Sequence, residues 1–239
     1  MKKFVLASDT LPATAQSTLI SLGYTPLLLP KCIRLQDGVA SHTDMLVFFF
    51  GAEYLCTKEY YAQAKDIFDK IDELGYTPRF TDELHGKDYP SDVLFNALLL
   101  KNRIYGLTSA LSKELINLAN KYKIEIVNVR QGYTKCSVCK VSENAIITAD
   151  EGIAKAAQAR GVDVLQIRAG HVRIDGYDCG FIGGSSGASD GAVYFCGDVL
   201  SHPDGKMISE FCEKHKKSCI SLSNDTLFDV GTLFFLSKV

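Results

Sequence analysis

The sequence predicts a five-bladed α/β propeller, in which strand-strand-helix-strand units surround a central channel. The first observation is a recurring pattern, because five segments begin with a polar residue and continue as an apolar strand. These polar residues recur at steps of 48, 44, 42 and 51 residues, a spacing typical of repeat architectures. They are Asp44, Asp92, Cys136, Asp178 and Asp229. The second is that a helix and a returning strand follow most of these segments. The alternative is a three-layer doubly wound sheet, for which the alternation of strands and helices is also evidence.

The N-terminal segment predicts a strand, a helix and a second strand. Residues 3–7 and 24–29 are the strands, and Leu11 and Pro12 open a helix that Gly23 ends. This unit lacks the strand with a polar start, which is found at residues 228–236. The two ends of the chain are therefore expected to share one unit and to close the ring.

The other four units are expected in order along the chain. A strand at 42–50, a helix at 58–74 ended by Gly75, and a strand at 76–80 form the first. The second has strands at 94–100 and 103–106 joined by Lys101-Asn102, a helix capped by Ser112, and a strand at 124–129. The third has strands at 134–141 and 146–148, a helix capped by Asp150, and a strand at 162–167. The fourth has a strand from Asp178, a turn at 189–191, a strand at 193–196, a helix capped by Asp204, and a strand at 218–222.

Composition favours a soluble protein that occupies residues 1–239 as a single domain. The net charge of −2 opposes a nucleic-acid partner, which calls for a basic surface. The longest apolar run, 45–52, is too short to span a bilayer. Asp9 interrupts the N-terminal apolar stretch, so a signal peptide is not expected. We expect a cytoplasmic protein, and nothing in the sequence indicates its oligomeric state.

The eight cysteines are expected to be free thiols. Cys136 and Cys139 are spaced as a Cys-x-x-Cys pair, but no second such pair or His-x-x-x-His accompanies them in the sequence. A structural zinc site needs four ligands, so neither a metal nor a cofactor is expected.

The polar strand starts are the candidate functional site. His42 and Asp44 lie two residues apart, which puts both side chains on one face of a strand. In a closed ring the equivalent positions of successive blades meet at one end of the axis. Four carboxylates there would repel one another unless a cation lies among them, and a guanidinium suits such a site. Each Asp could instead cap backbone amides at a strand start.

Cys136 is the candidate nucleophile, and His42 is the candidate general base. The neighbouring Lys135 would lower the pKa of the thiol, although alternation along a strand turns it to the opposite face. The alternative is a purely structural role for both residues, with Cys136 as a small buried hydrophobic residue and His42 as a hydrogen-bonded histidine of the core.

The segment 183–187 matches Gly-x-Ser-x-Gly, the pattern of a serine-hydrolase elbow. An elbow must enter a helix, whereas this segment leads to another strand. A tight hairpin that needs positive φ at its glycines is the simpler interpretation, and backbone amides that approach an anion are the alternative.

Several stretches resemble the pentein fold of the guanidino-group-modifying enzymes, and more closely an uncharacterised bacterial subfamily of that superfamily. They cover nearly the whole chain and include His42-Thr43-Asp44, Tyr89-Pro90-Ser91-Asp92 with Asn96, and the segments 131–137, 146–155, 180–187 and 227–231. The superfamily contains arginine and agmatine deiminases, dimethylargininases, amidinotransferases and a non-catalytic ribosome anti-association factor.

The resemblance implies that a cysteine thiolate attacks a guanidinium carbon, that the histidine of a His-x-Asp pair moves protons, and that carboxylates hold the cation. It makes Cys136, His42 and Asp44 the catalytic candidates. The candidates for substrate binding are Asp92, Asn96, Asp178, Asp229 and Lys135. In those enzymes the nucleophile lies in the last repeat, whereas Cys136 lies two repeats after His42. Cys179 is the other candidate thiol.

Two functions are therefore open. The first is a cysteine-dependent hydrolase or transferase that acts on a small guanidino or amidine compound. The second is a non-catalytic protein that uses the same residues to bind a small cation or a macromolecular partner.

Overall fold

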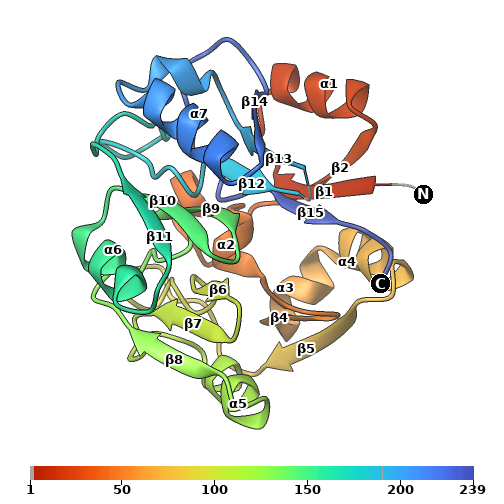
Figure 1. Ribbon diagram of the computed structural model, residues 1–239. Helices are drawn as coiled ribbons and strands as arrows, with labels where there is room; N and C mark the ends of the chain where they lie inside the picture. The colour runs from red at the N-terminus through yellow and green to blue at the C-terminus, as the bar shows by residue number, and fades with distance from the viewer. Residues whose placement is uncertain (1–2, 190) are drawn as a thin grey trace.

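The computed structural model describes residues 3–189 and 191–239 and forms five three-stranded sheets arranged around a central axis (Figure 1). In each sheet the first strand pairs antiparallel with the middle strand, which pairs parallel with the third. The sheets are β15 (Phe234–Leu236), β1 (Lys3–Ser8) and β2 (Tyr24–Leu29); β3 (Phe48–Phe50), β4 (Glu53–Thr57) and β5 (Thr77–Thr81); β6 (Leu98–Leu100), β7 (Arg103–Gly106) and β8 (Glu125–Asn128); β9 (Val138–Ser142), β10 (Ala145–Thr148) and β11 (Asp163–Gln166); and β12 (Ser186–Ala188), β13 (Ala192–Phe195) and β14 (Ser218–Ser221). This arrangement confirms the propeller and excludes the doubly wound sheet.

The two ends of the chain share one sheet, as the sequence predicts. β1 pairs antiparallel with β15, where Phe4 faces Leu236, and parallel with β2, where Lys3 faces Tyr24. The ring of sheets therefore closes through noncovalent pairing of the N-terminal and C-terminal segments.

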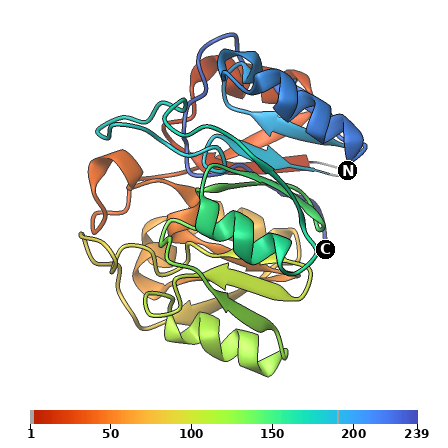
Figure 2. The ribbon, with the colours of Figure 1, turned by 60° about the vertical axis from the view of Figure 1, so that its left-hand side comes forward.

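Most helices lie on the outside of the ring (Figures 1 and 2). They are α1 (Ala13–Ser21), α3 (Lys58–Gln63), α4 (Lys65–Glu73), α5 (Lys113–Lys121), α6 (Glu151–Gln158) and α7 (Gly205–Lys214), while the short α2 (Thr43–Leu46) lies near the centre. Two 3₁₀ turns occupy Asp37–Val39 and Val199–Ser201. The predicted caps at Ser112 and Asp150 are confirmed, because these side chains accept from the amides of Glu114 and Ile153. None of the helices in the two described ranges is long and apolar enough to cross a membrane.

Each outer helix buries one face against its sheet. In α5 the buried residues Leu115, Leu118 and Ala119 follow the helical period, whereas Glu114 and Lys121 face solvent or the helix ends. Burial of each such leucine contributes about 1.5–3 kcal/mol to stability, so the helices hold the sheets in place from the outside. The axis is lined by the innermost strands β3, β6, β9, β12 and β15.

The innermost strands begin later than the sequence predicts. Residues 43–46 form α2 instead of strand, β6 begins at Leu98, and β9 begins at Val138. No strand of the described chain starts at Asp178, and the inner strand of that sheet begins at Ser186. Some of the polar residues before these strands bind backbone amides instead of continuing the ladder. Asn96 accepts from the amides of Lys135 and Cys136, and Asp229 accepts from those of Phe181 and Gly231. The predicted turn at 189–191 includes residue 190, which lies outside the described residues.

Candidate active site

His42, Asp44 and Cys136 meet at the centre of the ring. One side-chain donor atom from each lies within 4.8 Å of the other two, and all three residues are buried. The Cys136 Sγ lies 3.1 Å from Asp44 Oδ1, with the thiol as donor. The sequence prediction that these residues converge is therefore right, although α2 rather than a strand carries Asp44.

Asn96 fixes the position of Cys136. Its Oδ1 accepts from the backbone amides of Lys135 at 2.7 Å and Cys136 at 3.3 Å. This orientation turns Nδ2 toward Cys136 Sγ at 3.0 Å and toward Asp44 Oδ1 at 3.4 Å. A donor aimed at the sulfur stabilises the thiolate relative to the thiol.

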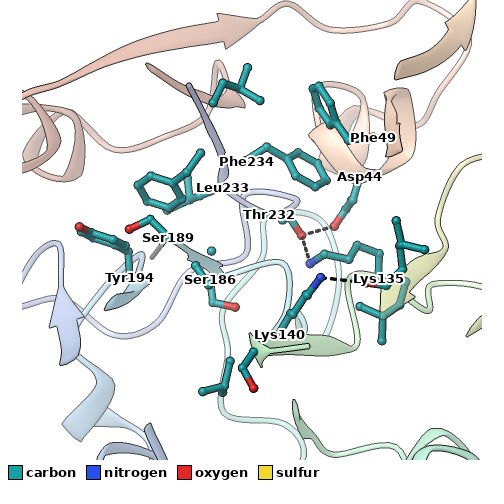
Figure 3. A pocket seen from close by; sticks show the side chains of 18 of the residues that line it. Asp44, Phe49, Lys135, Lys140, Ser186, Ser189, Tyr194, Thr232, Leu233 and Phe234 are labelled. Carbon is teal, nitrogen blue, oxygen red and sulfur yellow. Dashed lines mark hydrogen bonds between the residues drawn. The ribbon is translucent and has the colours of Figure 1, made fainter. Parts of the chain in front are cut away.

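The second oxygen of Asp44 belongs to a different network (Figure 3). Thr232 Oγ1 donates to Asp44 Oδ2 at 2.7 Å and accepts from Lys135 Nζ at 3.0 Å. Lys135 was expected to face away from Cys136, yet its buried side chain is linked through Thr232 to the same carboxylate that accepts from the Cys136 thiol. The chain turns before β9 begins, so the alternation of a strand does not apply to these two residues.

Asp229 lies beside His42 and is held by the backbone. Its Oδ1 accepts from the Gly231 amide at 2.9 Å, and its Oδ2 accepts from the Phe181 amide at 2.8 Å. His42 Nδ1 lies 3.7 Å from Asp229 Oδ1, and among the described residues it has no hydrogen-bond partner. A buried nitrogen without a partner is available to a ligand or a proton.

Burial dominates the acid-base chemistry of this site. It raises the pKa of the Cys136 thiol, and the nearby carboxylates of Asp44 and Asp229 raise it further. Burial raises the pKa of Asp44 and lowers the pKa of both His42 and Lys135. It raises the pKa of Asp229 to about 6, against the opposing effect of the two backbone amides. Without a ligand, the centre therefore favours the thiol over the thiolate.

Two predicted ring members lie elsewhere. Asp92 is buried, but it accepts from the Tyr133 hydroxyl at 2.6 Å instead of joining Asp44, and burial raises its pKa. Asp178 is exposed, and Cys179 next to it is exposed as well. The prediction that all five anchors converge is therefore wrong for Asp92, which pairs with Tyr133, and for Asp178, where the chain passes through an irregular loop before β12.

Two sequence interpretations of loop residues are corrected. The glycines of 183–187 do not have positive φ, so the expected hairpin is wrong. They allow close approach of the backbone, since a Cβ on Gly183 would lie 2.5 Å from the Cys136 carbonyl oxygen. Asp204 is no side-chain cap of α7, because its carboxylate binds the Arg168 guanidinium at 2.6 and 3.0 Å.

A cavity of about 860 Å³ lies between the innermost strands and reaches Asp44, whereas His42 and Cys136 are not among the residues that line it. Asp44, Lys135 and Thr232 line its polar end, and Phe49 and Phe234 are among its apolar walls (Figure 3). This volume fits a small-molecule ligand.

The imidazole of His42, the carboxylate of Asp44 and the thiol of Cys136 are ligand types that bind a transition metal such as zinc, and they lie close enough together to share one ion. Cys139 is not part of this group. The Cys-x-x-Cys spacing therefore does not mark the cluster, which joins residues from three parts of the chain.

Sequence reasoning missed Thr232. The predicted strand at 228–236 placed the anchor at Asp229, whereas β15 begins at Phe234 and Thr232 lies two residues before it. Asn96 and Cys136 also lie two residues before their strands, β6 and β9. Alignment on the strand starts instead of on the acidic residues would have identified Thr232.

The chain belongs to a family without an assigned activity. Residues 6–234 match the Family of unknown function (DUF6873). A search of curated proteins finds no significant match.

Solved structures show the fold. The chain is similar to the dimethylarginine dimethylaminohydrolase of Pseudomonas aeruginosa in complex with citrulline, with 11% identity, a TM-score of 0.58, and coverage of 94% of this chain and 93% of that chain. It is similar to an agmatine deiminase of C. jejuni, with 9% identity, a TM-score of 0.55, and coverage of 93% and 88%. An amidinotransferase of Microseira wollei has 11% identity, a TM-score of 0.50, and coverage of 95% and 93%. The protein therefore has the pentein fold of guanidino-modifying hydrolases and transferases.

Proposed function

We propose that this protein is a cysteine-dependent hydrolase or transferase that acts on a small guanidino or amidine compound, with Cys136 as nucleophile. The observation that carries the proposal is the mutual approach of His42, Asp44 and Cys136 to within 4.8 Å, directly behind a ligand-sized cavity that Asp44 lines. The fold that it shares with a dimethylargininase, a deiminase and an amidinotransferase agrees with this chemistry.

A cationic substrate would change the ionisation of the centre. Asp44 and Asp229 supply carboxylates for a guanidinium or amidinium, with which carboxylates form paired, charge-assisted hydrogen bonds. The positive charge of the substrate opposes the effect of these carboxylates on Cys136, so the pKa of the thiol falls when the site is filled. The empty protein then keeps an unreactive thiol, and the substrate itself promotes the thiolate.

The reaction follows from the positions of the three residues. The thiol proton passes to Asp44, and Sγ forms a bond to the amidine carbon. His42, neutral because burial lowers its pKa, accepts a proton from the adduct or from water and returns it to the leaving amine as the carbon–nitrogen bond breaks. Attack by water then releases the product and the thiol, whereas attack by an acceptor amine completes an amidino transfer.

The test is product formation with arginine, Nω-methylarginine and agmatine, together with covalent capture by 2-chloroacetamidine. We expect turnover of at least one compound, and one adduct on Cys136 measured by intact mass and peptide fragmentation. Cys136→Ala removes both. Cys179→Ala is the matched control, since it removes an exposed thiol outside the cluster and should change neither.

A second function, ligand binding without chemistry, is favoured by the raised pKa of the buried Cys136 thiol. It predicts that a guanidino compound protects the protein against thermal unfolding but yields no product. Turnover that depends on Cys136 would exclude it, and turnover that survives Cys136→Ala would exclude the first function.

A further inference from the structure

Thr232 has a backbone conformation that is rare for its residue type. Its φ is +74°, in the left-handed region where a β-branched residue is an outlier. The hydroxyl of Thr43 donates to the Thr232 carbonyl oxygen at 2.7 Å, and the Thr232 amide donates to the Gly184 carbonyl at 2.8 Å. The surrounding chain therefore holds Thr232 in a strained position, and such strain persists where the structure over-determines it.

The strained backbone places the Thr232 hydroxyl between an acid and a base. Oγ1 lies 2.7 Å from Asp44 Oδ2 and 3.0 Å from Lys135 Nζ, and the Gly183 carbonyl is 3.1 Å away. The carboxylate can take the hydroxyl proton, and the ammonium can stabilise the oxygen that loses it. This is the arrangement that activates a hydroxyl nucleophile, in which a base and an orienting group share one hydrogen-bond network.

The same hydroxyl faces the axial cavity. Thr232, Asp44 and Lys135 all line the cavity, and Lys140 and Ser186 lie nearby in its wall (Figure 3). The thiol of Cys136 bonds to the other oxygen of Asp44. One carboxylate thus lies between two nucleophiles, a thiol on Oδ1 and a hydroxyl on Oδ2.

We propose that Thr232, Asp44 and Lys135 form a hydroxyl-nucleophile centre that cleaves a small amide or ester bound in the axial cavity. Asp44 Oδ2 takes the proton of Thr232 as Oγ1 forms a bond to the carbonyl carbon. The intermediate then collapses, the bond to the amine or alcohol breaks, and Asp44 gives its proton to that leaving group. Water adds to the resulting threonyl ester, passing a proton through Asp44 back to Oγ1, and releases the acid.

This activity does not depend on the thiol chemistry proposed above. It uses a different nucleophile, acts on a carbonyl instead of an amidine carbon, and requires no cationic group in the substrate. The two proposals share Asp44 and can fail separately.

The test is reaction of the full chain with p-nitrophenyl acetate. We expect a burst of about one equivalent of p-nitrophenolate and an acetyl group on Thr232, located by fragmentation of the tryptic peptide 218–238. Thr232→Val should slow the burst by at least about 100-fold, since the nucleophile is removed. Lys135→Met should slow it by about 100-fold, since the charge that stabilises the deprotonated Thr232 oxygen is removed.

Two further variants separate chemistry from folding. Thr232→Ser keeps a hydroxyl at the same place and should restore the burst that Thr232→Val loses. Thr226→Val removes an exposed hydroxyl outside the cavity on the same tryptic peptide and should leave the burst as in the wild type. Far-ultraviolet circular dichroism checks that each variant is folded. The proposal is overturned if the wild type shows no burst, if the acetyl group is on Cys136 or Lys135, or if Thr232→Ser is as slow as Thr232→Val.

Discussion

The side chain of Asn96 clamps Cys136 from two directions, because it accepts from the Cys136 amide and donates to the Cys136 sulfur. The carboxamide is fixed in this orientation by the Lys135 amide, which also donates to Oδ1. A thiolate at this position would therefore have one oriented donor already in place.

Asn96→Ala should lower the reactivity of Cys136. The lost donor is a hydrogen bond to a charged group, which contributes about 1.5–3 kcal/mol, or roughly a tenfold to hundredfold change in rate. The rate of alkylation by 2-chloroacetamidine, followed by intact mass, measures the effect. Asn102→Ala, in the exposed turn between β6 and β7, is the control and should react at the wild-type rate. Equal rates for the two variants would show that Asn96 does not support the thiolate.

The sequence predicted the ring but not its register. Repeated apolar strands with Gly and capping signals were enough to give five sheets, the shared terminal sheet, and the caps at Ser112 and Asp150. The anchors were aligned on acidic residues, yet the chain bends around Asp92 and Asp178 before their strands begin. Periodicity does not report such loops, since their course depends on tertiary hydrogen bonds such as that between Asp92 and Tyr133.

The same limit applied to the site. His42, Asp44 and Cys136 were found from their chemical types, and Asn96 from the family resemblance. Thr232 carries no distinctive motif in the sequence. Its role depends on a positive φ and on contacts with Asp44 and Lys135, which are far from it along the chain.

His85 should make the protein less stable in mild acid. Burial lowers its pKa to about 4, whereas a histidine in the unfolded chain has a pKa of about 6.5. The unfolded state therefore binds the proton first, and stability is lost as the pH falls from about 6.5 toward 4, by about 3 kcal/mol. His85→Gln removes this group. Urea unfolding of both proteins at pH 7.5 and 4.5 measures the difference, and parallel pH dependence would contradict the assignment.

Asp229 should have the opposite effect on stability. Its pKa in the folded protein is about 6, above the value of about 4 in the unfolded chain, so the folded state binds the proton more tightly. The resulting stabilisation is present below about pH 4 and is lost as the pH rises through 6, by about 3 kcal/mol. The difference in unfolding free energy between the wild type and Asp229→Asn should therefore be more favourable to the wild type at pH 4 than at pH 7.5.

Asp178→Asn controls for the change in net charge, because that carboxylate is exposed. Its unfolding free energy should follow that of the wild type at both pH values. If the difference in unfolding free energy between the wild type and Asp229→Asn is also the same at both pH values, the Asp229 carboxyl does not keep a raised pKa in the folded protein.

Gly231 should be required for the position of His42. Its φ is +71°, and a Cβ there would lie 2.2 Å from the His42 Cβ and 2.4 Å from the His42 Cα. Gly231→Ala must therefore displace the backbone of His42, in addition to the cost of about 1–2 kcal/mol for a left-handed alanine. With a further cost of about 1–3 kcal/mol for overpacking, we expect the free energy of unfolding to fall by roughly 3 kcal/mol and the alkylation of Cys136 to slow.

Gly51 is the matched control, since its φ is +59° and a Cβ there would meet no atom within 4 Å. Gly51→Ala should lose only the left-handed cost and keep the wild-type alkylation rate. Urea unfolding of both variants separates the two costs, and equal losses would show that Gly231 serves the turn alone and not the placement of His42.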